Sequence, residues 1–108
     1  MVNGQELFIA DSGNHRIQVL NMTSGNYLRQ YGSLLHWPYA SVTHGNDLIV
    51  CDVGKPGLIV FDVMTGSVER IVGHPSSLFS FAPVDVTINC KNELFVCDDD
   101  QHCVHVFQ

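Results

Sequence analysis

Apolar residues fall into short runs that are separated by polar turns. An arrangement of two apolar runs joined by a tight polar loop occurs three times, at residues 6–20, 47–61 and 93–107. Short runs bounded by glycine, proline and asparagine predict β-strands. The predicted strands are residues 6–11, 16–21, 27–31, 38–44, 47–52, 58–62, 68–72, 84–88, 93–98 and 103–107.

The three segments are parts of a longer internal repeat. Residues 6–32 align without a gap to residues 47–73, and the third unit aligns through its second apolar run. Periods of about 40–50 residues with several short strands in each are typical of propeller blades. Identical pairs in the first two units are Leu7 and Leu48, Asp11 and Asp52, Gly13 and Gly54, Val19 and Val60, Gly25 and Gly66, Arg29 and Arg70, and Gly32 and Gly73.

The second and third predicted strands of each unit are apolar at nearly every position. A strand with one solvated face alternates between apolar and polar residues, so this pattern indicates sheets that are covered on both faces. Blades stacked side by side cover both faces of a sheet. We therefore predict an all-β fold, a partial β-propeller of four-stranded antiparallel blades, with repeats at about residues 6–32, 38–73 and 83–108 of a single 1–108 segment.

The polar loop of the first unit contains Asp11, Gly13, Asn14, His15, Arg16 and Ile17. This loop resembles the signature of the NHL repeat, which is named for its Asn-His-Leu element. The resemblance implies four-stranded blades that close into a ring. The second unit departs from the signature, with Lys55, Pro56 and Gly57 in place of Asn-His-Arg. The third unit keeps His102 but has Gln101 and Cys103 beside it.

The chain of 108 residues is too short to close a ring of such blades. It holds the last three strands of one blade, all four of the next and the first three of another. An open stack exposes an apolar sheet face at each end, and soluble monomers rarely expose contiguous apolar patches above about 600 Å². We expect either a segment of a longer protein or a unit that associates with its own copies.

The charge and the apolar runs limit the partners of this segment. The formal net charge is −6, so nucleic acid is not an expected ligand of this acidic segment. No apolar run is long enough to span a membrane, and the first residues lack the features of a signal peptide. No Cys-x-x-Cys pair is present, and cysteines that are predicted to be buried thiols favour a reduced setting. Together with the lack of a signal peptide or membrane span, this predicts a cytoplasmic location. We predict no cofactor.

Aspartate recurs where the second strand of each unit ends and a tight loop begins. A carboxylate in this position accepts hydrogen bonds from loop amides and closes the turn, and in the first unit it faces an arginine across the loop. A ring of carboxylates that binds a cation is the alternative interpretation. The predicted structural residues are Asp11, Gly13, Asn14, His15, Arg16, Asp52, Gly54 and Asp98.

Cysteine and histidine are the other candidates for chemistry. Cys51 and Cys97 occupy equivalent positions in the repeat, filled by Ala10 in the first unit, which predicts small buried residues between blades. Metal ligation or a disulfide is the alternative. A zinc site needs three or four converging ligands, and among the histidines His36 and His74 lie in equivalent links that could share a rim. We predict no metal ligand and no catalytic residue.

Four aromatic residues precede or enter the first strands of their units, and they are Trp37, Tyr39, Phe79 and Phe81. They either pack between blades or form an interaction surface on one face of the propeller. The link at residues 74–83 is longer than its counterpart at 33–38, and loops are where binding surfaces vary most.

The sequence predicts a non-catalytic binding module that holds a protein or another ligand. The NHL resemblance implies a place in a larger protein, such as a tripartite-motif-type ubiquitin ligase. It also implies two alternatives, a metal-dependent propeller enzyme (an amidating lyase or a lactonase-like protein) and an RNA-binding domain. No nucleophile motif is present, and fold alone does not choose among these functions.

Overall fold

The computed structural model describes residues 2–3, 5–32, 35–53, 57–72, 83–98 and 103–107. Every strand predicted from the sequence is present, with ends that differ by at most one residue. The strands are β1 (Val2–Asn3), β2 (Glu6–Asp11), β3 (Arg16–Asn21), β4 (Tyr27–Tyr31), β5 (Pro38–His44), β6 (Asp47–Asp52), β7 (Gly57–Asp62), β8 (Val68–Val72), β9 (Pro83–Ile88), β10 (Leu94–Asp98) and β11 (Cys103–Phe107). A 3₁₀ turn, η1 (Ser12–Asn14), joins β2 to β3.

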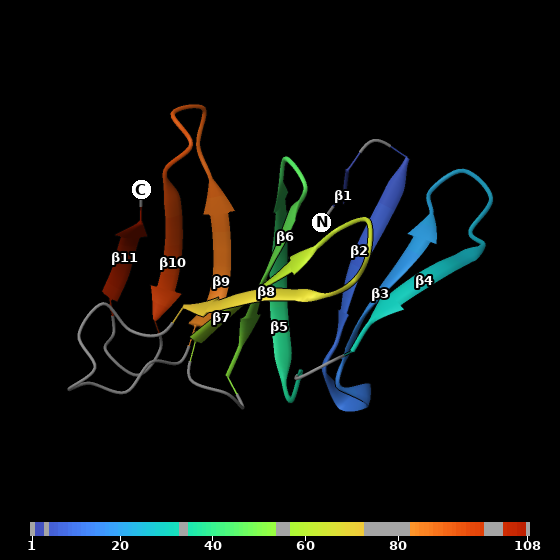
Figure 1. The fold of residues 1–108 in the computed structure, drawn as a ribbon, viewed down its shortest axis with the longest axis horizontal. Helices are drawn as coiled ribbons and strands as arrows, with labels where there is room; N and C mark the ends of the chain where they lie inside the picture. The colour runs from blue at the N-terminus through green and yellow to red at the C-terminus, as the bar shows by residue number, and fades with distance from the viewer. Residues whose placement is uncertain are drawn as a thin grey trace.

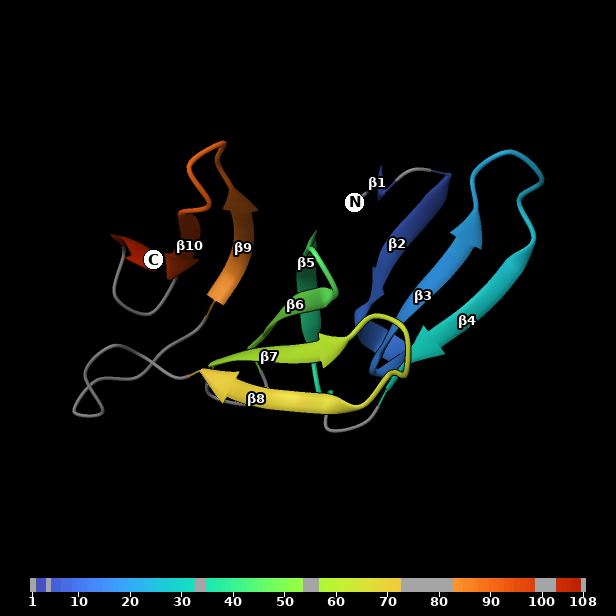
Figure 2. The same ribbon diagram turned by 45° about the horizontal axis from the view of Figure 1, so that its top comes forward.

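The strands form three antiparallel sheets in which chain neighbours pair: β1 to β4, β5 to β8, and β9 to β11. The sheets stand side by side like a fan, with the β5–β8 sheet in the middle (Figures 1 and 2). This is the arrangement of adjacent propeller blades, and it confirms the all-β prediction, with blades of three or four strands among the described residues. No helix in this part of the chain has the length and apolar character needed to cross a membrane.

Among the described strands, β1 is the one that is absent from the predicted set. Its two residues pair with the start of β2, Val2 opposite Leu7 and Asn3 opposite Glu6. The first sheet therefore has a short innermost strand, whereas the sequence predicted only the last three strands of this blade. A two-residue strand has too few positions to show a hydrophobic pattern, and its pairing with β2 defines it.

Strands β6 and β7 of the middle sheet are buried on both faces, as their apolar pattern predicts. Alternate residues of a strand point to opposite faces, so β6 and β7 supply two separate cores. Toward the first sheet, Leu48, Val50, Ile59 and Phe61 pack with Phe8, Ile17, Val19 and Tyr31. Toward the third sheet, Ile49, Cys51, Leu58 and Val60 pack with Val86 and Val96.

The outer face of the third sheet is exposed, because no described sheet covers it. It carries the repeat equivalents of residues that are buried in the middle sheet. The prediction of a small buried residue is confirmed for Cys51 and wrong for Cys97. The exposed residues are Cys97, Val104 and Val106, and their buried counterparts are Cys51, Leu58 and Val60.

An ion pair recurs between the second and fourth strands of the first two blades. Arg29 donates to both carboxylate oxygens of Glu6, at 2.8 and 2.9 Å. At the equivalent positions, Arg70 Nη2 lies 3.6 Å from Asp47 Oδ2. The Arg29 pair also supports the blade interface, because Arg29 donates to the hydroxyl of Tyr31, which donates to the Val63 carbonyl of the middle blade at 2.6 Å.

Candidate functional site

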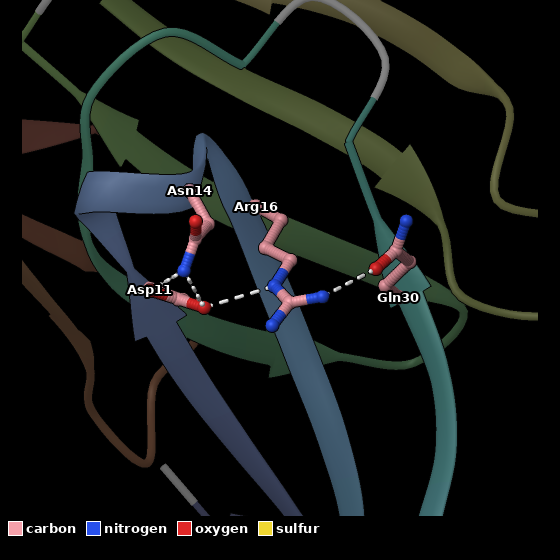
Figure 3. Close-up of polar contacts among 4 residues, drawn as sticks. All are labelled: Asp11, Asn14, Arg16 and Gln30. Carbon is pink, nitrogen blue, oxygen red and sulfur yellow. Dashed lines mark hydrogen bonds and ion pairs between the residues drawn. The ribbon is translucent and has the colours of Figure 1, made fainter.

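The loop between β2 and β3 is fixed by a network of polar side chains. Asp11 accepts hydrogen bonds from Asn14 Nδ2 at 3.0 and 3.1 Å and from Arg16 Nε at 2.9 Å (Figure 3). Arg16 Nη1 donates to Gln30 Oε1 on β4 at 2.9 Å. These donors, Asn14 first and then Arg16, hold the pKa of Asp11 below its usual range. The predicted pairing of Asp11 with Arg16 is confirmed.

The same loop contacts the link that precedes β5 of the next blade. His15 has a left-handed backbone, with φ of 58°, and its Nδ1 donates to the carbonyl of His36. Its ring stacks on His36 with centroids 5.6 Å apart and lies 6.0 Å from the Trp37 ring. Ser12 Oγ donates to the carbonyl of Pro38. The NHL-like loop is therefore a contact between two blades.

Asp52 holds this link from the other side. Its carboxylate accepts hydrogen bonds from the backbone N–H groups of His36, at 2.7 Å, and Trp37, at 2.9 Å. The residue is fully buried at the end of β6. The repeat pattern predicted donors from the loop that follows the aspartate, whereas these donors come from the link before β5. Gly54, in the following loop, lies outside the described residues.

We call the residues gathered here the rim patch: Asn14, His15, Arg16, His36 and Trp37. Arg16 is half-buried, and the other four residues are exposed. An open polar recess adjoins the patch, lined by Asn14, His15, Arg16, Gln30 and Gly32. Gly13 lies in the same loop, where an added Cβ would meet no atom within 4 Å, so close packing does not require glycine there.

The predicted aromatic surface is divided in the structure. Trp37 joins the rim patch with 38% of its surface exposed, which is enough for contact with a partner. Tyr39 instead lines a second recess between β2, β5 and β9, together with Ser41 and Asp85. Phe79 and Phe81 lie outside the described residues. Of the two aromatic residues that the structure describes, Trp37 lies beside the NHL-like loop and Tyr39 lines a different recess.

A second polar group lies at the equivalent end of the third blade. His105 Nε2 is 2.8 Å from Asp98 Oδ2 and 3.7 Å from Cys103 Sγ. Neither the histidines nor the cysteines alone predict this group from the sequence. The pairing register of the two predicted strands could have revealed it. Cys103 and His105 are two residues apart on one strand, and the repeat places Cys103 opposite Asp98. His74, the predicted partner of His36 at the rim, lies outside the described residues.

The four cysteines differ in burial and therefore in their expected reactivity. Cys51 is fully buried, and loss of hydration raises the pKa of its thiol to about 12, with further contributions from Asp85 and Cys97. A thiol with such a pKa is protonated at neutral pH and is a poor nucleophile and metal ligand. Cys90, Cys97 and Cys103 are exposed. Only exposed thiols are therefore available for chemistry among the four.

Comparison with known proteins supports the propeller architecture. The NHL repeat matches residues 1–20, which contain β2 and the loop with Asp11 and Asn14. The WD40 beta propeller domain of Doa1 superposes with a TM-score of 0.75 at 16% identity, covering 100% of this chain and 34% of that one. No curated protein sequence matches the chain.

Two further solved structures show the same fold. The computationally designed Ika4 protein gives a TM-score of 0.71 at 15% identity, covering 99% of this chain and 62% of that one. Kuenenia stuttgartiensis hydrazine synthase gives 0.67 at 17% identity, covering 94% of this chain and 32% of that one. The chain spans less than two thirds of each of these structures, and at these identities the likeness concerns the fold alone.

Proposed function

We propose that this partial β-propeller, which carries an NHL repeat at residues 1–20, is a non-catalytic platform that binds a protein partner at the rim patch. The observation that carries the proposal is the exposed Trp37, whose backbone is fixed by Asp52 and whose ring lies beside His15. Tryptophan is over-represented among residues that dominate binding energy. A side chain on a fixed backbone also loses less conformational freedom on binding.

The charges of the rim patch indicate the chemistry of the partner. Arg16 is paired with Asp11, so the patch offers little uncompensated positive charge. Its remaining groups are the Trp37 ring, two imidazoles and the Asn14 amide. We infer a partner segment that places an apolar or aromatic side chain on Trp37 and hydrogen-bonding groups toward Asn14 and the imidazoles. Strong electrostatic attraction of an acidic peptide or a nucleic acid is not part of this mechanism.

A binding role is also favoured by the geometry of the Cys103 group. A Cys–His–Asp relay uses the two ring nitrogens of histidine separately, one for the nucleophile and one for the carboxylate. Here Nε2 of His105 contacts both Asp98 Oδ2, at 2.8 Å, and Cys103 Sγ, at 3.7 Å. One nitrogen cannot donate to the carboxylate while it accepts the thiol proton. We therefore do not assign nucleophilic catalysis to this group.

The proposal extends to the parent protein and to further blades. We place the segment in a larger cytoplasmic protein, such as a tripartite-motif-type ubiquitin ligase, and the coding sequence on either side of these residues tests that setting. We also propose that the exposed outer sheet faces pack against further blades or against a second copy, because they carry the equivalents of residues that already pack between blades.

A photo-crosslinking amino acid at position 37 tests the platform. Met64, in the turn between β7 and β8, is 79% exposed and provides the matched control position. We expect position 37 to crosslink a specific protein and position 64 not to. The crosslinked protein, once purified, should bind the Trp37→Ala variant at least about tenfold more weakly than the wild type. Its affinity for the Met64→Ala variant should equal that for the wild type. Equal affinity of Trp37→Ala and wild type would overturn the proposal.

A further inference from the structure

The ends of β10 and β11 bring three different metal-binding side chains together. Asp98 is the last residue of β10 and Cys103 the first of β11, and the two are opposite each other in the ladder. His105 lies two residues further along β11, so its side chain projects from the same face as that of Cys103. One ligand atom from each of the three residues lies within 4.8 Å of the other two.

The burial of the three side chains suits a site with one open side. The Asp98 side chain is 0% exposed and the His105 side chain 15% exposed. Cys103 is exposed, so an ion can approach from solvent. Carboxylate oxygen, imidazole nitrogen and thiolate sulfur are the ligand types that zinc binds, and three protein ligands leave one coordination position for water.

In the first blade, the residue opposite the aspartate is a positively charged arginine. There Arg16 stands opposite Asp11, as Cys103 stands opposite Asp98, and its guanidinium contacts the carboxylate. The third blade replaces that fixed positive charge with a thiol and adds His105 beside it. A divalent ion bound between these groups would place positive charge next to the buried Asp98 carboxylate.

We propose that Asp98, Cys103 and His105 form a binding site for a zinc-class divalent metal ion. The ion is held by one carboxylate oxygen of Asp98, by Nε2 of neutral His105 and by the Cys103 thiolate. Binding displaces the thiol proton to solvent and breaks the His105–Asp98 hydrogen bond, with no change in oxidation state. The site joins the ends of β10 and β11 and is independent of the rim patch.

Cobalt(II) titration of the metal-free, reduced chain tests the site, because cobalt reports its ligands by absorption. We expect a thiolate-to-cobalt charge-transfer band that disappears when zinc displaces the cobalt. We also expect the melting temperature to increase on addition of zinc. Cys103→Ser should remove the band, and His105→Gln should weaken cobalt binding by at least about tenfold. Cys90→Ser and Cys97→Ser, which change the other exposed thiols, should retain the band and the affinity.

Three results would overturn the proposal. The first is a wild-type chain that gives no charge-transfer band and no zinc-dependent change in melting temperature, which would leave an ordinary His105–Asp98 hydrogen bond. The second is a band that persists in Cys103→Ser, and the third is a band that disappears in Cys90→Ser. Circular dichroism of each variant establishes that its sheets are intact, and His105→Gln provides the second readout if Cys103→Ser is unfolded.

Discussion

At the level of single residues, the aspartate that recurs in the repeat faces a different residue in each blade. The aspartate that ends the second strand of each unit is opposite Arg16 in the first blade, Gly57 in the second and Cys103 in the third. In the first blade this aspartate accepts hydrogen bonds from side chains, and in the second it accepts them from two backbone N–H groups. The repeat therefore specifies a carboxylate, and the surrounding residues decide its function.

Replacement of Asp52 by alanine should destabilise the chain more than replacement of Asp11. Asp52 is fully buried and accepts two backbone N–H groups, and loss of a buried acceptor costs about 1–3 kcal/mol. Asp11 is partly exposed, so water can replace its contacts. Urea denaturation of Asp52→Ala and Asp11→Ala gives the comparison. Equal midpoints would show that the Asp52 carboxylate does not fix the link before β5.

Stability should also decrease in acid through the Glu6–Arg29 pair. The hydrogen bonds from Arg29 lower the pKa of Glu6 from its ordinary value of 4.5. A carboxyl whose pKa is lower in the folded state contributes stability above its unfolded pKa and loses that contribution as the pH falls through the folded value. The pair is about one-third exposed, so solvent screening keeps the contribution small.

The Glu6→Gln variant isolates this contribution. Between about pH 6 and about pH 3, the urea midpoint of the wild type should fall further than that of Glu6→Gln. Because other carboxylates titrate in both proteins, the difference between the two curves reports Glu6. Parallel curves over this range would mean that the Arg29 pair contributes no pH-dependent stability.

At the scale of elements, the blades are held together by the faces of β6 and β7. Val60 and Val106 occupy equivalent positions in the repeat, yet Val60 is 2% exposed and Val106 is 51% exposed. The same substitution at these two positions therefore compares a covered blade face with an uncovered one.

We expect Val60→Ala to cost about 2 kcal/mol, because it removes buried methyl groups and leaves a cavity between blades. In dilute solution Val106→Ala should cost less than about 0.5 kcal/mol. Denaturation of both variants at low protein concentration measures the difference. A large loss for Val106→Ala under these conditions would show that its sheet face is already covered in the dilute protein.

At the scale of the whole molecule, two outer sheet faces are left without a neighbouring sheet among the described residues. The third sheet presents Val104 and Val106, each more than half exposed. The first sheet presents Leu7, Ile9 and Leu20, which are partly buried. Their equivalents in the middle sheet lie in the two blade interfaces. The two outer faces therefore have the composition of the two halves of one such interface.

The chain should associate through these faces as its concentration rises. Light scattering coupled to size exclusion should give a mass that increases above the 12.0 kDa of one chain, since burial is worth about 25 cal/mol per Å² of apolar surface. Val104→Asp, which places a charge on the exposed face of β11, should reduce the association. Val60 is unsuitable for this test because it lies between blades. A constant mass of one chain at all concentrations would contradict the prediction.

The strands, the turns and the blade repeat could be predicted from the sequence alone. These depend on local features: apolar runs of strand length, polar loops at their ends, and a period that recurs in one chain. The turn after β7 illustrates this, because Asp62 Oδ1 accepts the N–H groups of Met64 and Thr65, and Gly66 has a positive φ of 76°. The ion pair of Asp11 with Arg16 was also predictable, because both residues flank one short loop.

Features that depend on segments distant in the sequence, or on which sheet lies next to which, become visible only in the folded structure. Cys51 and Cys97 are equivalent in the repeat, and only the presence of a covering sheet makes one buried and the other exposed. The stacking of His15 on His36 and the donors of Asp52 depend on how a loop meets the next blade. The group of Asp98, Cys103 and His105 depends on ladder register, which sets which side chains share a face. Sequence patterns report the local preference of each strand, whereas burial and convergence arise only when the strands and blades are placed together.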